Sequence, residues 1–370
     1  MQQDDDLEFT PSRKERRMER KVAIAKDRSK YKKTDRTKYL KGLQEEHALK
    51  VGKQEWLQGR VLSIISRGII VDCEGEELMC VLKGLMKRDR TSAKNLVSVG
   101  DFVLFEKTGS HEGIIAQVLP RRTILSRADN LSRRKEQLIA VNIDQVLITV
   151  SIVSPSLKVP LIDRYIIAAR KGKMDPIVII NKVDLLEFHD NDVLVQDEMH
   201  LLSELQKAYA AIQVPLLCVS TVTGVGMDEL REVMKDKASV FSGQSGVGKS
   251  SLINAITGTD LRVGETVERT QKGSHTTTSP QLIPLEFGGW CIDTPGIKSF
   301  GVWDLKKEEV ESYYSEIHAL GRRCKFPNCT HMHESDCAVM MALEAGELSP
   351  VRFDSYQALM LSLEGEYKRR

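Results

Sequence analysis

The sequence lacks any long apolar run. No stretch of about 18 consecutive apolar residues occurs among its 370 residues, so a membrane-spanning helix is not expected. The N-terminus is highly charged and has no apolar core of a secretory signal, so export is not expected either. Internal repeats and low-complexity stretches are also missing. With 41% hydrophobic and 29% charged residues, the composition is typical of a soluble globular protein, and we expect a cytoplasmic one of two or three domains.

Large apolar side chains are few in residues 1–50, which predicts a disordered arm or a loose helix. Between Arg13 and Lys41 there are fourteen Lys or Arg residues against four Asp or Glu, although the formal net charge of the whole chain is only +2. The rest of the chain is therefore net acidic. A concentrated basic arm favours a polyanionic partner, with RNA as the first choice. The alternative is a solvated tail with no specific role.

Cysteine is limited to seven residues, an odd number, in a chain without an export signal, so clustered cysteines favour a metal site over disulfides. Three of them form the pattern Cys324-x4-Cys329-x-His331-x5-Cys337. Three thiolates and one imidazole complete a closed tetrahedral Zn²⁺ site, which is structural because no position is left for a substrate. The alternative, reduced buried cysteines, is weakened by the polar residues between them. His333 could replace His331, but we expect it outside the coordination sphere.

Short alternating apolar runs from Trp56 onward predict five strands and a small β-barrel of the OB type. The strands are expected at Arg60–Ile65, Gly68–Asp72, Leu78–Leu82, Asp101–Phe105 and Gly113–Leu119. Past Arg121 the rhythm changes to alternating strands and helices, which predicts a parallel sheet covered by helices. Those elements are expected at Val146–Val150, Leu161–Arg170, Ile177–Ile180, Asp197–Ala210 and Pro215–Val219. A polar, helix-rich segment follows Phe300.

A phosphate-binding loop is predicted between a strand at Ala238–Ser242 and a helix at Ser251–Thr257. The intervening residues match the pattern G-x-x-x-x-G-K-[ST], whose glycines let backbone N–H groups point at phosphate oxygens. The helix N-terminus adds a partial positive charge there. Lys249 should reach the β- and γ-phosphates, and the Ser250 hydroxyl should ligate Mg²⁺. We expect nucleotide contacts from Gly243, Gln244, Ser245, Gly246, Val247, Gly248, Lys249, Ser250 and Ser251.

Guanine recognition is predicted by Asn181-Lys182-Val183-Asp184, which follows a strand directly. The Asp184 carboxylate can accept hydrogen bonds from N1–H and the 2-amino group of guanine, whereas adenine has neither donor and would leave the carboxylate unpaired. An ATP-dependent kinase or transport ATPase would share the phosphate loop but has no use for this motif. Ser220-Thr221-Val222 is expected either to contact the base edge through its backbone or to be an ordinary βα turn.

Two switch segments are expected after the phosphate loop. Asp293-Thr294-Pro295-Gly296 follows a strand at Trp290–Ile292, so Asp293 would hold Mg²⁺ through a water and the Gly296 N–H would sense the γ-phosphate. Gly273-Ser-His-Thr-Thr-Thr278 would add one threonine hydroxyl to Mg²⁺; Thr277 is favoured, with Thr276 and Thr278 left open. The Mg²⁺ set is therefore expected to be Ser250, Thr277 and Asp293.

The catalytic residue is harder to assign. Many GTPases place a glutamine directly after D-x-x-G to orient the attacking water, but this chain has Ile297 there, which cannot do so. His275, in the expected switch, is the candidate; the alternative is a solvated loop histidine. We therefore expect slow intrinsic turnover that a partner accelerates.

The motifs stand in an unusual order, with N-K-x-D before the phosphate loop and D-T-P-G after it. A sheet can survive this circular permutation, because domain termini often lie close together. The switch after Gly296 then runs into the C-terminal segment, which nucleotide state could move as a lever. The expected fold is a circularly permuted α/β P-loop GTPase domain after an OB-type barrel and before a helical zinc-binding domain. The expected boundaries are 1–50 for the arm, 51–122 for the barrel, 123–302 for the GTPase domain and 303–370 for the zinc domain.

The permuted order, GQSGVGKSS, GSHTTT, DTPG and the Cys/His spacing behind an OB-like barrel resemble the ribosome small-subunit-dependent GTPase A family, also written RsgA, over residues 55–340. The resemblance implies a GTPase that acts late in small-subunit maturation, with ribosomal RNA contacted by the barrel and the zinc domain. It also implies that the assembling subunit stimulates hydrolysis and that His275 takes part. In a second interpretation, GTP only sets the affinity of an RNA-binding assembly factor. A monomer is expected, with GTP and GDP as small-molecule partners.

Overall fold

The computed structural model describes residues 56–83, 96–128, 136–186, 192–258, 280–293 and 305–367.

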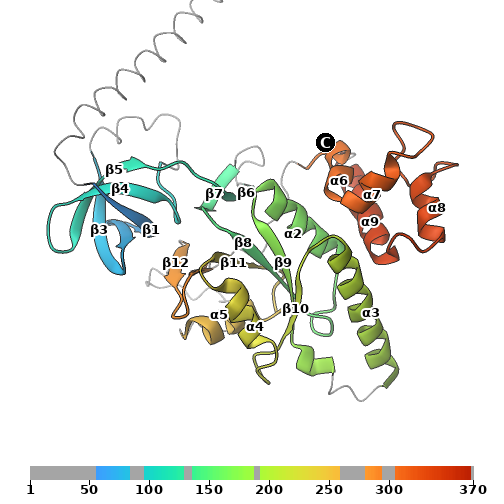
Figure 1. Cartoon of the computed structure of the whole chain (residues 1–370), viewed down its shortest axis with the longest axis horizontal. Helices are drawn as coiled ribbons and strands as arrows, with labels where there is room; N and C mark the ends of the chain where they lie inside the picture. The colour runs from blue at the N-terminus through green and yellow to red at the C-terminus, as the bar shows by residue number, and fades with distance from the viewer. Residues whose placement is uncertain are drawn as a thin grey trace, which may run out of the picture. The chain divides into compact units, whose positions relative to one another are not determined.

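Five short strands with alternating burial form a closed barrel. The barrel strands are β1 (Leu57–Ile65), β2 (Gly68–Cys73), β3 (Glu76–Leu82), β4 (Phe102–Lys107) and β5 (Glu112–Val118) (Figure 1). They pair in the order β1-β2-β3-β5-β4, and β4 closes back onto β1. The β3–β5 pair is parallel and the other pairs are antiparallel, so the barrel is of the expected OB type.

A parallel sheet forms the centre of the next part of the chain. Its parallel strands are β8 (Gln145–Val150), β9 (Asp175–Asn181), β10 (Leu216–Val219), β11 (Ala238–Ser242) and β13 (Trp290–Asp293). They lie in the order β10-β9-β8-β11-β13, and β12 (Gln281–Pro284) adds an antiparallel edge. Every residue of β8 and β11 is buried, as expected for central strands covered on both faces. One residue pair, Ser63 with Gln281, joins the barrel strand β1 to β12.

Helices cover both faces of this sheet. The helices α2 (Val159–Lys171) and α3 (Asp192–Ala211) pack in one apolar core with the Val146 and Ile148 face of β8. The helices α4 (Met227–Met234) and α5 (Lys249–Thr257) pack in a second core with Leu147 on the opposite face. Successive residues of a strand point to opposite faces, so one buried strand serves both cores. The hairpin of β6 (Ile124–Ala128) and β7 (Glu136–Val141) precedes β8, and a short 3₁₀ helix, η2 (Val183–Leu186), follows β9.

The C-terminal helices pack against α2. They are α6 (Lys307–Tyr313), α7 (Ser315–Gly321), α8 (Ala338–Glu344) and α9 (Pro350–Tyr367), and they enclose an apolar core of their own. A buried polar cluster joins them to α2: the Asp163 carboxylate accepts hydrogen bonds from Arg352 and from the Tyr209 hydroxyl, the latter at 3.0 Å. The Arg352 Nε also donates to Glu316 at 2.7 Å, and its guanidinium lies 4.4 Å from the ring centroid of Tyr314.

The structure confirms the strands and helices expected from the sequence, with ends shifted by a few residues. The sequence did not predict the β6–β7 hairpin, the 3₁₀ helix η2, the eight-residue α4 or the four-residue strand β12. The domain boundaries and the N-terminal arm stay predictions, since residues 1–55 lie outside the described part of the chain. Within the described ranges, no helix combines the length and the apolar character needed to cross a membrane.

Candidate functional site

The candidate site lies at the carboxyl edge of the parallel sheet. Because β8, β9, β10, β11 and β13 are parallel, the segments that follow them emerge at one edge. In open α/β sheets this edge is where ligands bind. The phosphate loop follows β11, the Asn-Lys-x-Asp motif lies at the end of β9, and Ser220 follows β10. Segments that lie far apart in the sequence, such as Asn181 and Val247 at 66 positions, therefore meet in one place.

The phosphate loop has a backbone that only glycine fits at two positions. Gly243 and Gly248 have φ of 149° and 91°, in the region that side chains rarely adopt. A Cβ on Gly243 would lie 2.0 Å from the Thr149 carbonyl oxygen, and one on Gly248 would lie 2.4 Å from Asn181 Nδ2. The loop therefore packs closely against the ends of β8 and β9, and α5 begins directly after it at Lys249.

Lys249 is held over this loop. Its Nζ donates to the carbonyl oxygens of Gly243 at 2.8 Å and Gln244 at 2.7 Å. No ion-pair partner for it occurs among the described residues, and burial lowers the pKa of its ammonium group below the usual lysine value. A half-buried ammonium without a countercharge is a receptor for an anion, and the N-terminus of α5 adds further positive potential.

The Asn181 and Lys182 side chains fasten the base-recognition segment to the phosphate loop. Asn181 Nδ2 donates to the Val247 carbonyl at 2.8 Å. Lys182 Nζ donates to the Gly246 carbonyl at 2.6 Å and to the Ser154 carbonyl at 2.9 Å. The two motifs are therefore one connected unit, joined by hydrogen bonds from the first two residues of N-K-x-D.

Asp184 is oriented by Ser220. Asp184 is buried in η2, and its Oδ1 accepts a hydrogen bond of 2.5 Å from the Ser220 hydroxyl. That hydroxyl in turn accepts hydrogen bonds of 3.2 Å from the backbone N–H groups of Val222 and Thr223. Both interpretations of the Ser220 segment, backbone contact to the base or an ordinary turn, overlooked this side-chain role. Sequence alone could not show it, because the two residues are 36 positions apart.

A third segment at this edge was missed altogether. The residues after β8 reach the phosphate loop: Ser154 accepts from Lys182, and its own N–H donates to Ser151 Oγ at 3.2 Å. A Cβ on Gly246 would come within 3.8 Å of Pro155 Cδ. The available signal was topological: β8 lies between β9 and β11, so its C-terminal loop must lie between their two motifs.

Several predicted site residues cannot be placed. His275, Thr276, Thr277, Thr278 and Gly296 lie outside the described residues, as does the side chain of Asp293, whose backbone ends β13. Ser250 and Ser251 lie in the first turn of α5, beside Lys249, and Ser250 is exposed. The Mg²⁺ set and the catalytic histidine therefore stay predictions.

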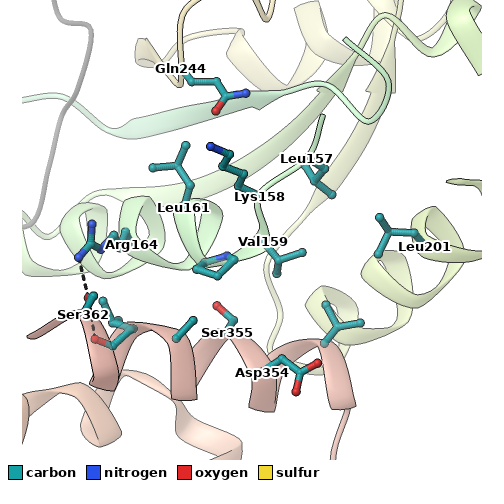
Figure 2. A pocket seen from close by; sticks show the side chains of 14 residues that line it. Leu157, Lys158, Val159, Leu161, Arg164, Leu201, Gln244, Asp354, Ser355 and Ser362 are labelled. Atoms are coloured by element: carbon teal, nitrogen blue, oxygen red, sulfur yellow. Dashed lines mark hydrogen bonds between the residues drawn. The ribbon is translucent and has the colours of Figure 1, made fainter. Parts of the chain in front are cut away.

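A groove of about 790 Å³ borders the phosphate loop. Its walls come from the start of α2, from α3 and from α9, and Gln244 of the phosphate loop lies at its upper edge (Figure 2). The figure shows the Gln244 side chain above Lys158 and Leu161, with Asp354 on the opposite helix. The C-terminal helix thus approaches the nucleotide-binding edge without contributing a known motif residue.

The cysteine and histidine cluster has the dimensions of a tetrahedral metal site. Its four ligand atoms all lie within 4.8 Å of one another. In a tetrahedral site, Zn–S bonds of about 2.3 Å and Zn–N bonds of about 2.0 Å give distances between ligand atoms of about 3.8 Å for two sulfurs and about 3.5 Å for a sulfur and a nitrogen. The Cys324 and Cys337 sulfurs are 3.8 Å apart, and His331 Nδ1 lies 3.3 Å from Cys337 Sγ and 3.6 Å from Cys324 Sγ. These residues therefore fit a bound Zn²⁺ ion.

The loop that carries these ligands is fixed by Glu334. Its carboxylate accepts hydrogen bonds of 2.6 Å from both the N–H and the hydroxyl of Thr330, and longer ones from the next turn. Burial alone would raise the pKa of Glu334, but these hydrogen bonds lower it well below the usual carboxyl value. Burial raises the pKa of the Cys329 thiol to about 12, so metal binding must release a proton there. His333 is exposed.

Comparison with known proteins agrees with this geometry. The RsgA GTPase family model matches residues 118–303. A protein of Chlorobaculum tepidum named small ribosomal subunit biogenesis GTPase RsgA is 38% identical, covering 84% of this chain and 99% of the relative. One of the same name from Thermotoga maritima is 33% identical, covering 84% and 98%.

Solved structures give the same result. The crystal structure of YjeQ from Thermotoga maritima superposes with a TM-score of 0.66 at 30% identity, covering 84% of this chain and 99% of that one. The structure of YloQ, described as a circularly permuted GTPase, superposes with a TM-score of 0.64 at 27% identity, covering 85% and 97%. The permuted motif order, the sheet and these matches together show that the chain belongs to the RsgA family of circularly permuted GTPases.

Proposed function

We propose that this protein binds the small ribosomal subunit and hydrolyses GTP during the late maturation of that subunit, with turnover that the subunit stimulates. The relatives named above are small ribosomal subunit biogenesis GTPases, which supports the partner. One structural observation supports the nucleotide: the buried Asp184 carboxylate, oriented by Ser220, lies in a segment that Asn181 and Lys182 fasten to the phosphate loop.

Phosphate binding is assigned to the phosphate loop. Backbone N–H groups of residues 243–251 would surround the phosphates, and Lys249 would exchange its two carbonyl partners for β- and γ-phosphate oxygens. Because burial already disfavours the uncompensated ammonium, the phosphate supplies the countercharge that the loop lacks.

Guanine binding is assigned to Asp184. The Asp184 carboxylate has acceptor sites left beside the hydrogen bond from Ser220, and these would accept hydrogen bonds from N1–H and the 2-amino group of guanine. The hydrogen bond from Ser220 fixes the plane of the carboxylate. Asn181 and Lys182 keep base and phosphate sites in register, and Val183 contributes to the turn that presents Asp184.

Hydrolysis needs residues that assemble with Mg²⁺ and a partner. Ser250, Thr277 and, through a water, Asp293 would hold Mg²⁺, which would supply positive charge against the negative charge that develops on the phosphates. His275 is the candidate for orienting the attacking water, because Ile297 occupies the usual glutamine position. We expect the partner to complete this site, which would account for stimulation by the subunit.

The Cys/His cluster is assigned a structural role, and the barrel, the zinc-binding helices and the basic arm are assigned to RNA binding. Cys324, Cys329, His331 and Cys337 would hold one structural Zn²⁺. The OB-type barrel and the zinc-binding helices would contact ribosomal RNA, and the basic arm at residues 13–41 would strengthen that contact. We infer a cytoplasmic, monomeric protein.

The proposal is tested by GTP turnover with small ribosomal subunits, with large subunits and with neither. We expect small subunits to stimulate GTP turnover and large subunits not to do so. Equal turnover in the three mixtures would refute the ribosomal partner while leaving the GTPase assignment intact.

A further inference from the structure

The outer nitrogen of His331 faces a carboxylate. His331 is buried, and its Nδ1 points at the thiols of Cys324 and Cys337, as a ligand atom must. Its Nε2 is also buried and makes no hydrogen bond with the residues that the structure describes. Glu311 Oε2 lies 3.6 Å from this nitrogen.

An imidazole that binds a metal through Nδ1 carries its proton on Nε2. A buried N–H left without an acceptor costs about 1–3 kcal/mol, so this N–H requires one. Among the described residues, the Glu311 carboxylate is the charged group that lies beside this nitrogen. Shortening the distance from 3.6 Å to a hydrogen bond of about 2.8 Å is a movement within the reach of side-chain torsions.

The packing around the pair leaves room for this contact. Gly321, the last residue of α7, borders both side chains. A Cβ at this position would lie 2.9 Å from Glu311 Oε1 and 3.0 Å from His331 Nε2. The other carboxylate oxygen, Oε1, lies 3.1 Å from His318 Nδ1, which holds the Glu311 side chain from the α7 side.

We propose that Glu311 is a positioning residue for the metal centre: its carboxylate accepts a hydrogen bond from the Nε2–H of His331 and so fixes Nδ1 toward the metal. The inference rests on the zinc site proposed above. It ties metal binding to α6, a helix that supplies none of the four ligands. Removal of such a partner of a ligating histidine typically lowers metal affinity 10–100-fold.

The experiment measures the zinc affinity of the full-length protein by competition with a chromogenic chelator. Glu311→Ala is expected to bind zinc roughly 10–100-fold more weakly than the parent. Glu311→Gln keeps an acceptor oxygen and is expected to retain most of the affinity. Glu308→Ala removes an exposed carboxylate from the same helix and serves as the matched control, with unchanged affinity expected. Equal affinity for Glu311→Ala and the parent would overturn the inference.

A second measurement does not depend on whether the alanine variant folds. Nitrogen-15 NMR of the zinc-loaded parent reports which His331 nitrogen carries the proton. We expect a proton on Nε2 that exchanges slowly with water and shifts upfield in Glu311→Gln. A proton on Nδ1, or an Nε2 proton unaffected by the substitution, would refute the role of Glu311. If the parent binds no zinc, the metal assignment itself fails, which is distinguishable from the failure of Glu311 alone.

Discussion

The buried contact between Asp163 and Arg352 should dominate the docking of the C-terminal helices on α2. The two side chains are 1% and 3% exposed. Removing one partner of a buried ion pair leaves an uncompensated charge and typically costs about 3–5 kcal/mol. Arg352→Met keeps an unbranched apolar stem but removes the guanidinium group and its charge. We therefore expect the free energy for opening α9 to fall by about 3–5 kcal/mol.

Native-state hydrogen exchange of the α9 amides measures this quantity locally, without assuming that the whole chain unfolds in one step. At about 1.4 kcal/mol per tenfold, the buried amides around Phe353 and Tyr356 should exchange roughly a hundred- to several-thousand-fold faster. Asp163→Asn keeps the hydrogen-bonding shape without the charge. Combined with Arg352→Met, it should cost less than the sum of the two single changes, because no unpaired charge then remains at position 163. Strict additivity, or a loss below about 1 kcal/mol for Arg352→Met, would refute the reasoning.

The pH dependence of stability provides a check on the role of the Asp163 charge. Burial raises the pKa of Asp163 above its unfolded value, because desolvation outweighs the attraction of Arg352. A carboxyl with a raised folded pKa loses stability as the pH rises from its unfolded pKa through its folded pKa. Without Arg352 the folded pKa rises further, so the stability deficit of Arg352→Met should shrink as the pH is lowered from neutrality. A deficit that grows on acidification would contradict the assignment of the cost to an unpaired carboxylate.

Two further predictions concern the nucleotide site. Ser220→Ala removes the hydroxyl that orients Asp184, so GDP affinity measured by fluorescence titration should fall roughly tenfold, equivalent to about 1.4 kcal/mol; an unchanged affinity would count against the orienting role. Burial lowers the pKa of Lys249. Since the phosphates bind the protonated form, GDP affinity should decline as the pH rises above neutrality, whereas Lys249→Arg, which stays charged, should bind with a flatter pH profile. Parallel profiles for the parent and the variant would exclude Lys249 as the titrating group.

Motifs with fixed spacing were predictable from the sequence. The phosphate loop, the Asn-Lys-x-Asp segment and the Cys/His cluster each depend on residues close together in the chain, and the structure brings the described members of each together. The common position of the phosphate loop and the Asn-Lys-x-Asp segment at one sheet edge followed from the parallel strands that precede them.

Contacts between distant segments were not predictable in the same way. Ser220 and Asp184 come together only because β9 and β10 are neighbours in the sheet. Asp163 and Arg352 are 189 residues apart. Short elements were missed for a different reason. The strand β12 has only four residues and ends at Pro284, and α4 has only eight, so both are shorter than the window of about 11–18 residues in which a periodic pattern is recognised.

The most direct test of the account is an exchange of base specificity at Asp184. In the parent protein, GTP should bind much more tightly than ATP or xanthosine triphosphate, because only guanine offers two donors to the carboxylate. In Asp184→Asn the amide N–H₂ can donate to the 2-carbonyl oxygen of xanthine, so GTP should weaken while xanthosine triphosphate becomes the preferred ligand. Equal affinities of the parent for GTP and ATP, or a variant that keeps its preference for GTP, would contradict the assignment of Asp184 as the guanine-reading residue.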